Sequence, residues 1–182
     1  MKRHVKYLLK ILILGTVLSC TSTIDLNQLD TVELNQSLTS TFVYLKVNQN
    51  NFLNNTSNTE LTSLSDVSVI DIFDSDYVQE NIITSNFSFE IENSFNRDFI
   101  LDIAFLNADN NTTKSFTINV PRNSSISHFQ SYEGLDLLSL KLSQKVRITL
   151  YLQPSDDASI LTEGNEMNFE LKSFTNFVLK VN

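Results

Sequence analysis

The feature that most limits the fold is an alternation of apolar and polar residues with a period of two. The clearest run spans residues 86–92, where phenylalanine and isoleucine take one face and serine and glutamate the other. Side chains of a β-strand point alternately to its two faces, so the pattern predicts half-buried antiparallel strands, since buried parallel strands read as continuous apolar runs. Similar runs occupy residues 42–47, 67–73, 99–106, 114–120, 145–152, 168–171 and 174–181.

Short polar segments rich in Asn and Asp connect these runs, and the whole chain has only three glycines. Asn and Asp tolerate the left-handed backbone conformation that tight turns need. Helical spacing of leucines predicts a short helix over residues 135–143, and a capping-type cluster, Asp74-Ser75-Asp76, predicts another over residues 75–81. A slip in the alternation at Lys172–Ser173 predicts a β-bulge. We therefore expect an all-β fold, an immunoglobulin-like antiparallel β-sandwich of about seven to eight strands with one or two short helices. A partly open barrel is the alternative.

The first nineteen residues have the pattern of an export signal. Four basic residues, with no acidic one among them, precede an apolar run, Ile11–Leu18. That run is too short for a membrane-spanning helix, which needs about 20 residues. We interpret residues 1–19 as a signal peptide.

The end of this segment, Val17-Leu18-Ser19-Cys20, resembles the lipobox of bacterial lipoproteins, although Leu18 stands where a smaller residue is usual. The resemblance implies cleavage before Cys20, a diacylglyceryl group on its thiol and acylation of the new amine. Two or more acyl chains give stable anchoring where one does not. Residues 20–40 would then be a lipidated tether leading into an edge strand, with a disordered tether as the alternative. Residues 41–182 would form a single β-sandwich domain. A plain secretory signal is the alternative to the lipobox.

Three further resemblances are more local or more general. Taken whole, the chain resembles small, asparagine-rich lipoproteins of Bacteroidota, which implies no particular activity. Residues 89–106, with Asn93 and Asn96 in the turn, resemble the strand–Asn-turn–strand core of water-stress (LEA-14 type) immunoglobulin-like domains. Asp30-Thr31-Val32 resembles the O-glycosylation sequon of Bacteroidota, which implies a sugar on Thr31; coincidence is the alternative.

Composition excludes several kinds of chemistry. The chain has one Cys, two His and three Gly, too few for an intrachain disulfide, a thiolate metal site or a glycine-rich phosphate loop. Its formal charge is −8, and loss of the four basic residues of the signal takes this to −12. Such an acidic balance argues against a nucleic-acid partner, which needs clustered Lys and Arg.

Three weaker candidate sites remain. His128 lies beside Ser124, Ser125 and Ser127 and could serve a hydrolase or a ligand pocket, although a surface or capping role is the simpler interpretation. Calcium prefers oxygen ligands, so Asp71, Asp74 and Asp76 are calcium candidates, against a simpler interpretation as a helix cap with solvated acids. Tyr132 and Tyr151 leave open a carbohydrate platform, which the lack of Trp disfavours.

We therefore predict a non-enzymatic lipoprotein of the cell envelope, acting as an interaction or structural module without a cofactor. Its expected partners are the membrane, through the lipid on Cys20, and an envelope protein. Thr21 after the cysteine is not the inner-membrane retention residue Asp, which favours the outer membrane by analogy and leaves the periplasmic or surface side open. The alternatives are a ligand-binding or hydrolytic protein with a pocket near His128, and a calcium-dependent adhesion module.

Overall fold

The computed structural model describes residues 34–54, 59–162 and 167–181. Leu34–Asn182 form one compact unit. The signal peptide, Cys20 and Thr31 lie outside the described residues, so the predictions about them stay predictions.

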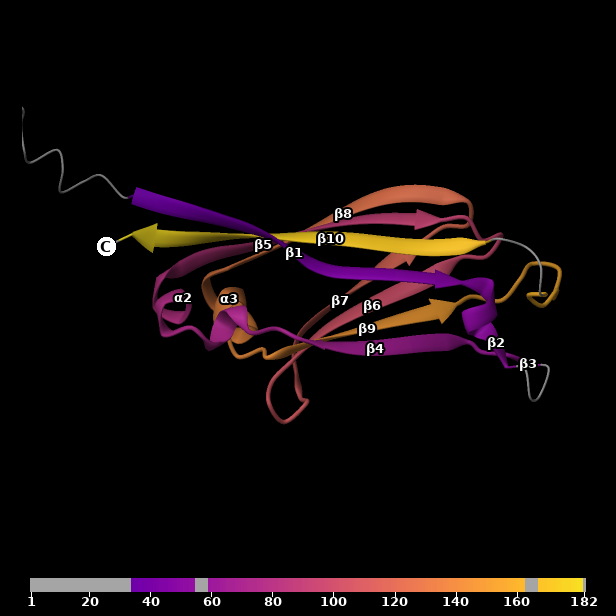
Figure 1. Cartoon of the computed structure of the whole chain (residues 1–182), viewed down its shortest axis with the longest axis horizontal. Coiled ribbons are helices and arrows are strands. Elements are labelled where there is room, and N and C mark those ends of the chain that lie inside the picture. The colour runs from indigo at the N-terminus through magenta and orange to yellow at the C-terminus, as the bar shows by residue number, and fades with distance from the viewer. Residues whose placement is uncertain (1–33, 55–58, 163–166, 182) are drawn as a thin grey trace, which may run out of the picture. The chain divides into compact units, whose positions relative to one another are not determined.

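The described unit is a sandwich of two four-stranded antiparallel sheets (Figure 1). The first sheet has the order β1-β10-β5-β8 and the second β4-β9-β6-β7, while β2 and β3 pair separately. The strands are β1 (Leu34–Asn48), β2 (Leu53–Asn54), β3 (Thr59–Glu60), β4 (Ser63–Val69), β5 (Ile82–Asn93), β6 (Phe99–Leu106), β7 (Thr112–Val120), β8 (Ser124–Glu133), β9 (Lys145–Leu152) and β10 (Asn168–Val181).

The eight long strands pair as one long hairpin rolled on itself. The first pairs with the last (β1 with β10), the second with the seventh (β4 with β9), the third with the sixth (β5 with β8) and the fourth with the fifth (β6 with β7). This is the jelly-roll order. The predicted all-β antiparallel sandwich is thus confirmed, while its strand connections differ from those of immunoglobulin domains. Both folds use short alternating strands and tight turns, so the sequence pattern does not separate them.

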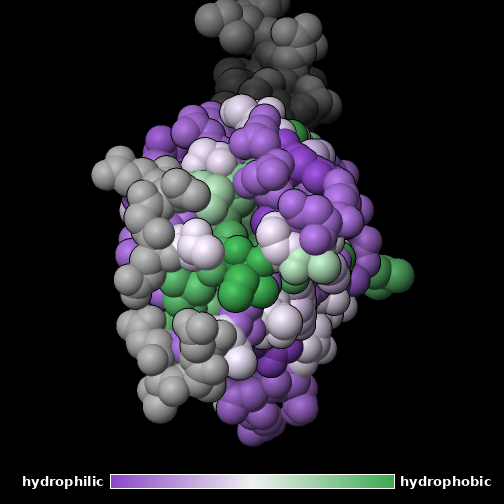
Figure 2. Space-filling view, turned by 90° about the vertical axis from the view of Figure 1, so that its right-hand side faces the viewer, coloured by the Kyte–Doolittle hydropathy of each residue, from purple (hydrophilic) through white to green (hydrophobic). Residues whose placement is uncertain are grey.

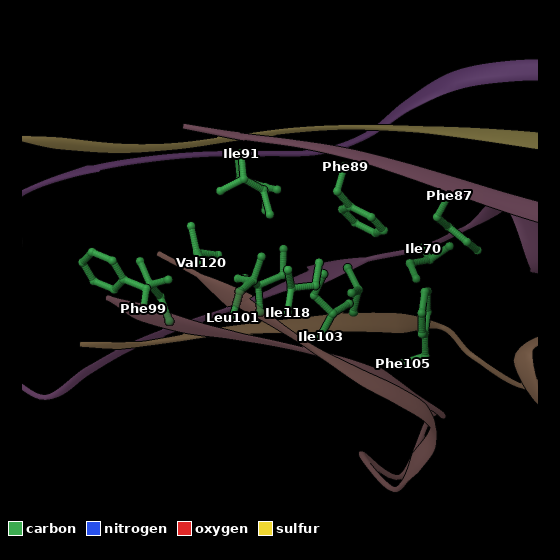
Figure 3. Close-up of a cluster of buried hydrophobic side chains, with 14 of the residues drawn as sticks. Ile70, Phe87, Phe89, Ile91, Phe99, Leu101, Ile103, Phe105, Ile118 and Val120 are labelled. Carbon is green, nitrogen blue, oxygen red and sulfur yellow. The ribbon is translucent and has the colours of Figure 1, made fainter. Parts of the chain in front are cut away.

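The core lies between the two sheets and is built largely from phenylalanine. In Figure 3, Phe87, Phe89 and Ile91 of β5 point toward side chains of β6 and β7 on the facing sheet. Nine of the thirteen phenylalanines are buried, as the alternation predicts. They are Phe52, Phe73, Phe87, Phe89, Phe95, Phe99, Phe105, Phe169 and Phe177.

The predicted irregularity near Ser173 exists, but the extra residues lie on the neighbouring strand. Thr41 pairs with Phe174 and Tyr44 with Lys172, so two residues of β1 oppose Ser173 alone. The Val43 amide donates to Ser173 Oγ (2.8 Å), and that hydroxyl donates back to the Val43 carbonyl (2.7 Å). The buried hydroxyl therefore replaces the ladder bonds lost at the bulge.

Both predicted helices are present. They are α2 (Asp76–Asn81) and α3 (Gly134–Leu140), and two 3₁₀ turns, η2 (Gln49–Phe52) and η3 (Ile72–Asp74), complete the elements. Gly134 begins α3 with φ of +54°, a conformation that favours glycine, while Asn110 and Asn123 take positive φ in turns. Among the described helices, none is long and apolar enough to cross a membrane.

Edge strand β1 begins at Leu34, which places residues 34–40 inside the sandwich. The polar, mildly acidic composition of residues 20–40 predicts a tether leading into an edge strand, and the strand starts earlier than predicted. The side chains from Asn35 to Ser40 are all exposed, which explains their polar composition.

Candidate functional site

The three calcium candidates lie around the short turn before α2. Asp71 precedes η3, Asp74 is its last residue and Asp76 begins α2. All three side chains are exposed. Within the described part of the chain, no three His, Cys, Asp or Glu side chains are grouped closely enough to hold a metal ion. The structure therefore does not assemble these aspartates into one ligand set.

His128, on β8, packs against aromatic rings from both sheets. Its ring stacks on Phe116, with centroids 5.5 Å apart and planes at 15°, and lies 6.2 Å from the Phe89 ring. Its Nε2 is buried and has no hydrogen-bond partner among the described residues. This environment is that of a histidine packed at the margin of the core.

Of the two tyrosines considered for a carbohydrate platform, Tyr132 is buried against Phe87 and Phe105. Burial, assisted by the charge of Asp136, raises the pKa of its phenol to about 12. Tyr151 is 42% exposed on β9. The structure therefore does not pair these two rings on one surface.

A better-formed site lies between two of the four free sheet edges, those of β1 and β4. Strand β1 pairs only with β10 and strand β4 only with β9, and the two unpaired edges border the same side of the sandwich. Between them is a cleft of about 310 Å³, which we call the edge cleft. That volume is at the lower limit of small-molecule pockets.

The edge cleft has an apolar interior and a polar mouth. Phe42, Ile70 and Phe177 come from three different strand regions and bring core side chains to its wall. Hydroxyl groups and the carboxylate of Asp71 lie among them. Its lining residues are Leu38, Thr39, Ser40, Thr41, Phe42, Ser68, Val69, Ile70, Asp71, Ile72, Val146, Thr175 and Phe177.

The backbone of β4 is presented to this side. The Val67 amide donates to the Asp66 carboxylate (2.9 Å) instead of to a neighbouring strand. Backbone N–H and C=O groups point alternately to the two edges of an antiparallel strand. The backbone groups of residues 65 and 69 therefore point to the same open edge as those of Val67. Val67 and Val69 are 49% and 77% exposed, so this edge is also apolar. Natural proteins usually protect such an edge with charge or proline.

The apolar run predicted as one strand over residues 67–73 is only partly a strand. β4 ends at Val69, and Ile72–Asp74 form η3. Ile70 is buried and Ile72 partly buried beyond the end of the strand, whereas Val67 and Val69 on the strand are exposed. The two valines are therefore the sign of an apolar edge in the sequence, but alternation alone does not show that they are exposed.

Comparison with known proteins gives neither a matching family model nor a matching curated protein. Among solved structures, a protein of Parabacteroides distasonis described as secreted shares 15% identity over 63% of this chain and 38% of that chain, with a TM-score of 0.48. The VP2 subviral particle of infectious bursal disease virus shares 8% identity over 80% and 33%, with a TM-score of 0.41. PfGH50B shares 16% identity over 84% and 23%, with a TM-score of 0.44.

This chain thus spans well under half the length of each of these three proteins. At such identities and TM-scores, the similarities assign it no activity, substrate or partner.

Proposed function

We propose that this protein is a non-enzymatic interaction module of the cell envelope, anchored in the outer membrane by lipid on Cys20, and that its partner binds in the edge cleft. The partner is an extended segment of another envelope protein, which adds a strand to the free edge of β4. The single observation that carries this proposal is an apolar cleft lying between two unpaired strand edges.

Strand addition would use both the unpaired strand edge and the apolar cleft. Free backbone groups of β4 supply the hydrogen bonds, and alternate side chains of the added strand enter the space between the sheets. The exposed valines and the buried residues behind them give these side chains an apolar surface to cover. The local Asp66–Val67 bond occupies one edge amide until the partner replaces it.

The cleft is tested by photo-crosslinking in living cells, with the crosslinking residue at position 69 of the full chain. We expect a discrete adduct, and a loss of that adduct when Val67→Pro removes an outward-facing amide. Proline is tolerated at edge positions whose amide faces solvent, and thermal unfolding checks that the fold survives.

The matched control carries the crosslinker at position 129, where Phe129 is 61% exposed on the outer face of β8. Equal adducts from positions 69 and 129, or an adduct at 69 that survives Val67→Pro in a folded protein, would contradict strand addition.

The anchor is tested separately by fractionation. Cys20→Ala removes the only thiol in the chain, so the variant should leave the mature, lipid-modified membrane pool. A mature protein that stays in the membrane fraction unchanged would show that the lipobox interpretation is wrong.

A further inference from the structure

Helix α3 is apolar on both of its faces. Leu137 and Leu140 are buried in the core, whereas Leu135, Leu138 and Leu142 are 82%, 57% and 67% exposed. Leu135 and Leu138 are three residues apart and share one side of α3, and Leu142 follows in the turn just after the helix. A globular helix normally presents polar residues there, so this leucine face is an apolar surface without a partner inside the described chain.

The leucine face belongs to the end of the sandwich at which the chain enters it. Figure 1 shows α2 and α3 at the same end as the start of β1 and the C-terminus. The Gln79 amide donates to the Lys141 carbonyl (2.8 Å), and the Lys141 ammonium donates to the Gln79 carbonyl (2.6 Å), so the two helices are joined. Other exposed apolar side chains on the elements that meet here are Tyr77, Ile83 and Val181.

The length of chain before Leu34 limits how far this end can lie from a membrane. Cys20 is fourteen residues before Leu34, a distance of at most about 50 Å in a fully extended chain. A lipid on Cys20 would therefore hold the sandwich by its α2–α3 end. Tethering also raises the effective concentration of the leucine face at the bilayer, so a patch too small to bind alone can bind when anchored.

Charges next to the leucine face nearly cancel, in contrast to the formal charge of −12 expected after removal of the signal. The Lys114 ammonium pairs with the Asp136 carboxylate directly beside the leucines. Around α3 itself, two lysines offset two acids. These are Lys114, Lys141, Glu133 and Asp136. A nearly neutral border presents little electrostatic barrier to a neutral lipid surface.

We propose that the leucine face docks on the phospholipid leaflet that carries the anchor, with its leucines entering the boundary between headgroups and acyl chains. This orientation rests on the proposed lipid anchor. The edge cleft lies between β1 and β4, and its lining reaches Asp71 and Ile72, just before α2. Because burial of apolar surface drives it, docking should occur on zwitterionic lipid and change little with salt.

The absence of Trp from the sequence allows a site-specific test. Leu138→Trp introduces a single fluorophore on the leucine face, and Phe129→Trp introduces one at a similarly exposed position, 61% against 57%, on the outer face of β8. Each mature lipidated protein is reconstituted into phosphatidylcholine vesicles with or without brominated acyl chains. We expect brominated lipid to quench the Leu138→Trp variant at least twofold more strongly, with a blue-shifted emission, at both low and high salt.

Adding Leu135→Ser and Leu142→Ser to the Leu138→Trp variant should restore its emission toward that of the control. Vesicle flotation is measured on the same samples. If the protein floats with the vesicles but quenching is equal at both positions, the anchor stands and docking of the leucine face is wrong. This is the result expected if a protein covers the leucines instead. Failure to float would overturn the anchor and the orientation that rests on it.

Discussion

The two ends of the sandwich are closed in opposite ways. At the end with loops, seen face-on in Figure 2, apolar residues lie at the centre, with hydrophilic residues above them, to their right and below them. There Arg97 is almost fully buried and donates from Nε to the Gln153 carbonyl (2.7 Å) and from Nη1 to the Ser159 carbonyl (3.0 Å). Its Nη2 lies 3.2 Å from the Glu60 carboxylate, which also accepts from the Leu161 amide (3.0 Å). One cation thus ties three chain segments together.

At the other end two short helices close the sandwich. The outward side of α3 is apolar, whereas α2 exposes Asp76, Tyr77 and Glu80. Only the inward leucines of α3 stabilise the core, while the outward three have no partner among the described residues. The comparison shows two different roles. At the loop end a buried charged side chain stabilises the fold, whereas at the helix end exposed leucines leave an apolar surface available for binding.

The Asn93 side chain links two neighbouring turns at the loop end by hydrogen bonds. Its Nδ2 donates to the Arg97 carbonyl (2.9 Å) and to the Pro121 carbonyl (2.8 Å), and its Oδ1 accepts from the Phe95 amide (3.0 Å). One buried amide therefore holds the β5–β6 and β7–β8 connections together. Arg97 lies within the first of these connections, so its position depends on the same turn.

The largest effect should follow from Arg97→Met. Removing one partner of a buried ion pair costs about 3–5 kcal/mol, because the other charge stays partly buried without compensation. For a domain of this size we expect a loss of about 6–20 °C in Tm by calorimetry. Adding Glu60→Gln to this variant should recover part of the loss.

The matched control is Arg122→Met. Arg122 also contacts two carboxylates, those of Asp98 (3.4 Å) and Asp156 (2.6 Å), but its side chain is 40% exposed. Exposed ion pairs contribute little to stability, so this variant should unfold close to the wild-type temperature. Arg122 lies at the same end, so similar losses for both arginines would contradict the special role of the buried charge of Arg97.

A smaller effect is expected from Tyr132, which lies under the helix end and whose pKa is raised by burial to about 12. Because this pKa is about 10 in the unfolded chain, the buried neutral phenol contributes its full stability below pH 10. That contribution is lost as pH rises toward 12. In urea unfolding at pH 8 and pH 11.5, wild type should lose about 2 kcal/mol more than Tyr132→Phe. Equal losses would show that the phenol ionises freely in the folded protein.

The sequence was most informative where one face of a strand is buried and the other is wet. In β5, strict alternation of phenylalanine with serine and glutamate predicts the strand and its inward side chains, and the structure agrees. Both helices were also predictable, α3 because the leucine spacing over residues 135–142 is helical, and α2 because the Asp74-Ser75-Asp76 cluster is typical of a helix start. Which leucines are buried was not predictable, since a helix that is apolar all round has no pattern to separate its faces.

Long-range pairing was beyond the sequence pattern. The partners in β1 and β10 are more than a hundred residues apart, and alternation does not say which strand lies beside which. The Arg97–Glu60 pair joins a turn to a two-residue strand, so no spacing rule relates the two residues. The edge cleft follows from the same pairing, because β1 and β4 are free edges only in this strand order.

The smallest expected effect on stability is the sharpest test of the helix end. Leu138→Ala and Leu140→Ala make the same change two residues apart on α3, with Leu138 57% exposed and Leu140 fully buried. Leu140→Ala should cost about 2–5 kcal/mol, because it leaves a cavity under the helix. Leu138→Ala should change the free energy of unfolding by no more than about 0.5 kcal/mol, since a surface substitution removes few contacts. Urea unfolding of the two variants measures the difference, and a large loss for Leu138→Ala would mean that its side chain serves the fold rather than a surface held for the membrane.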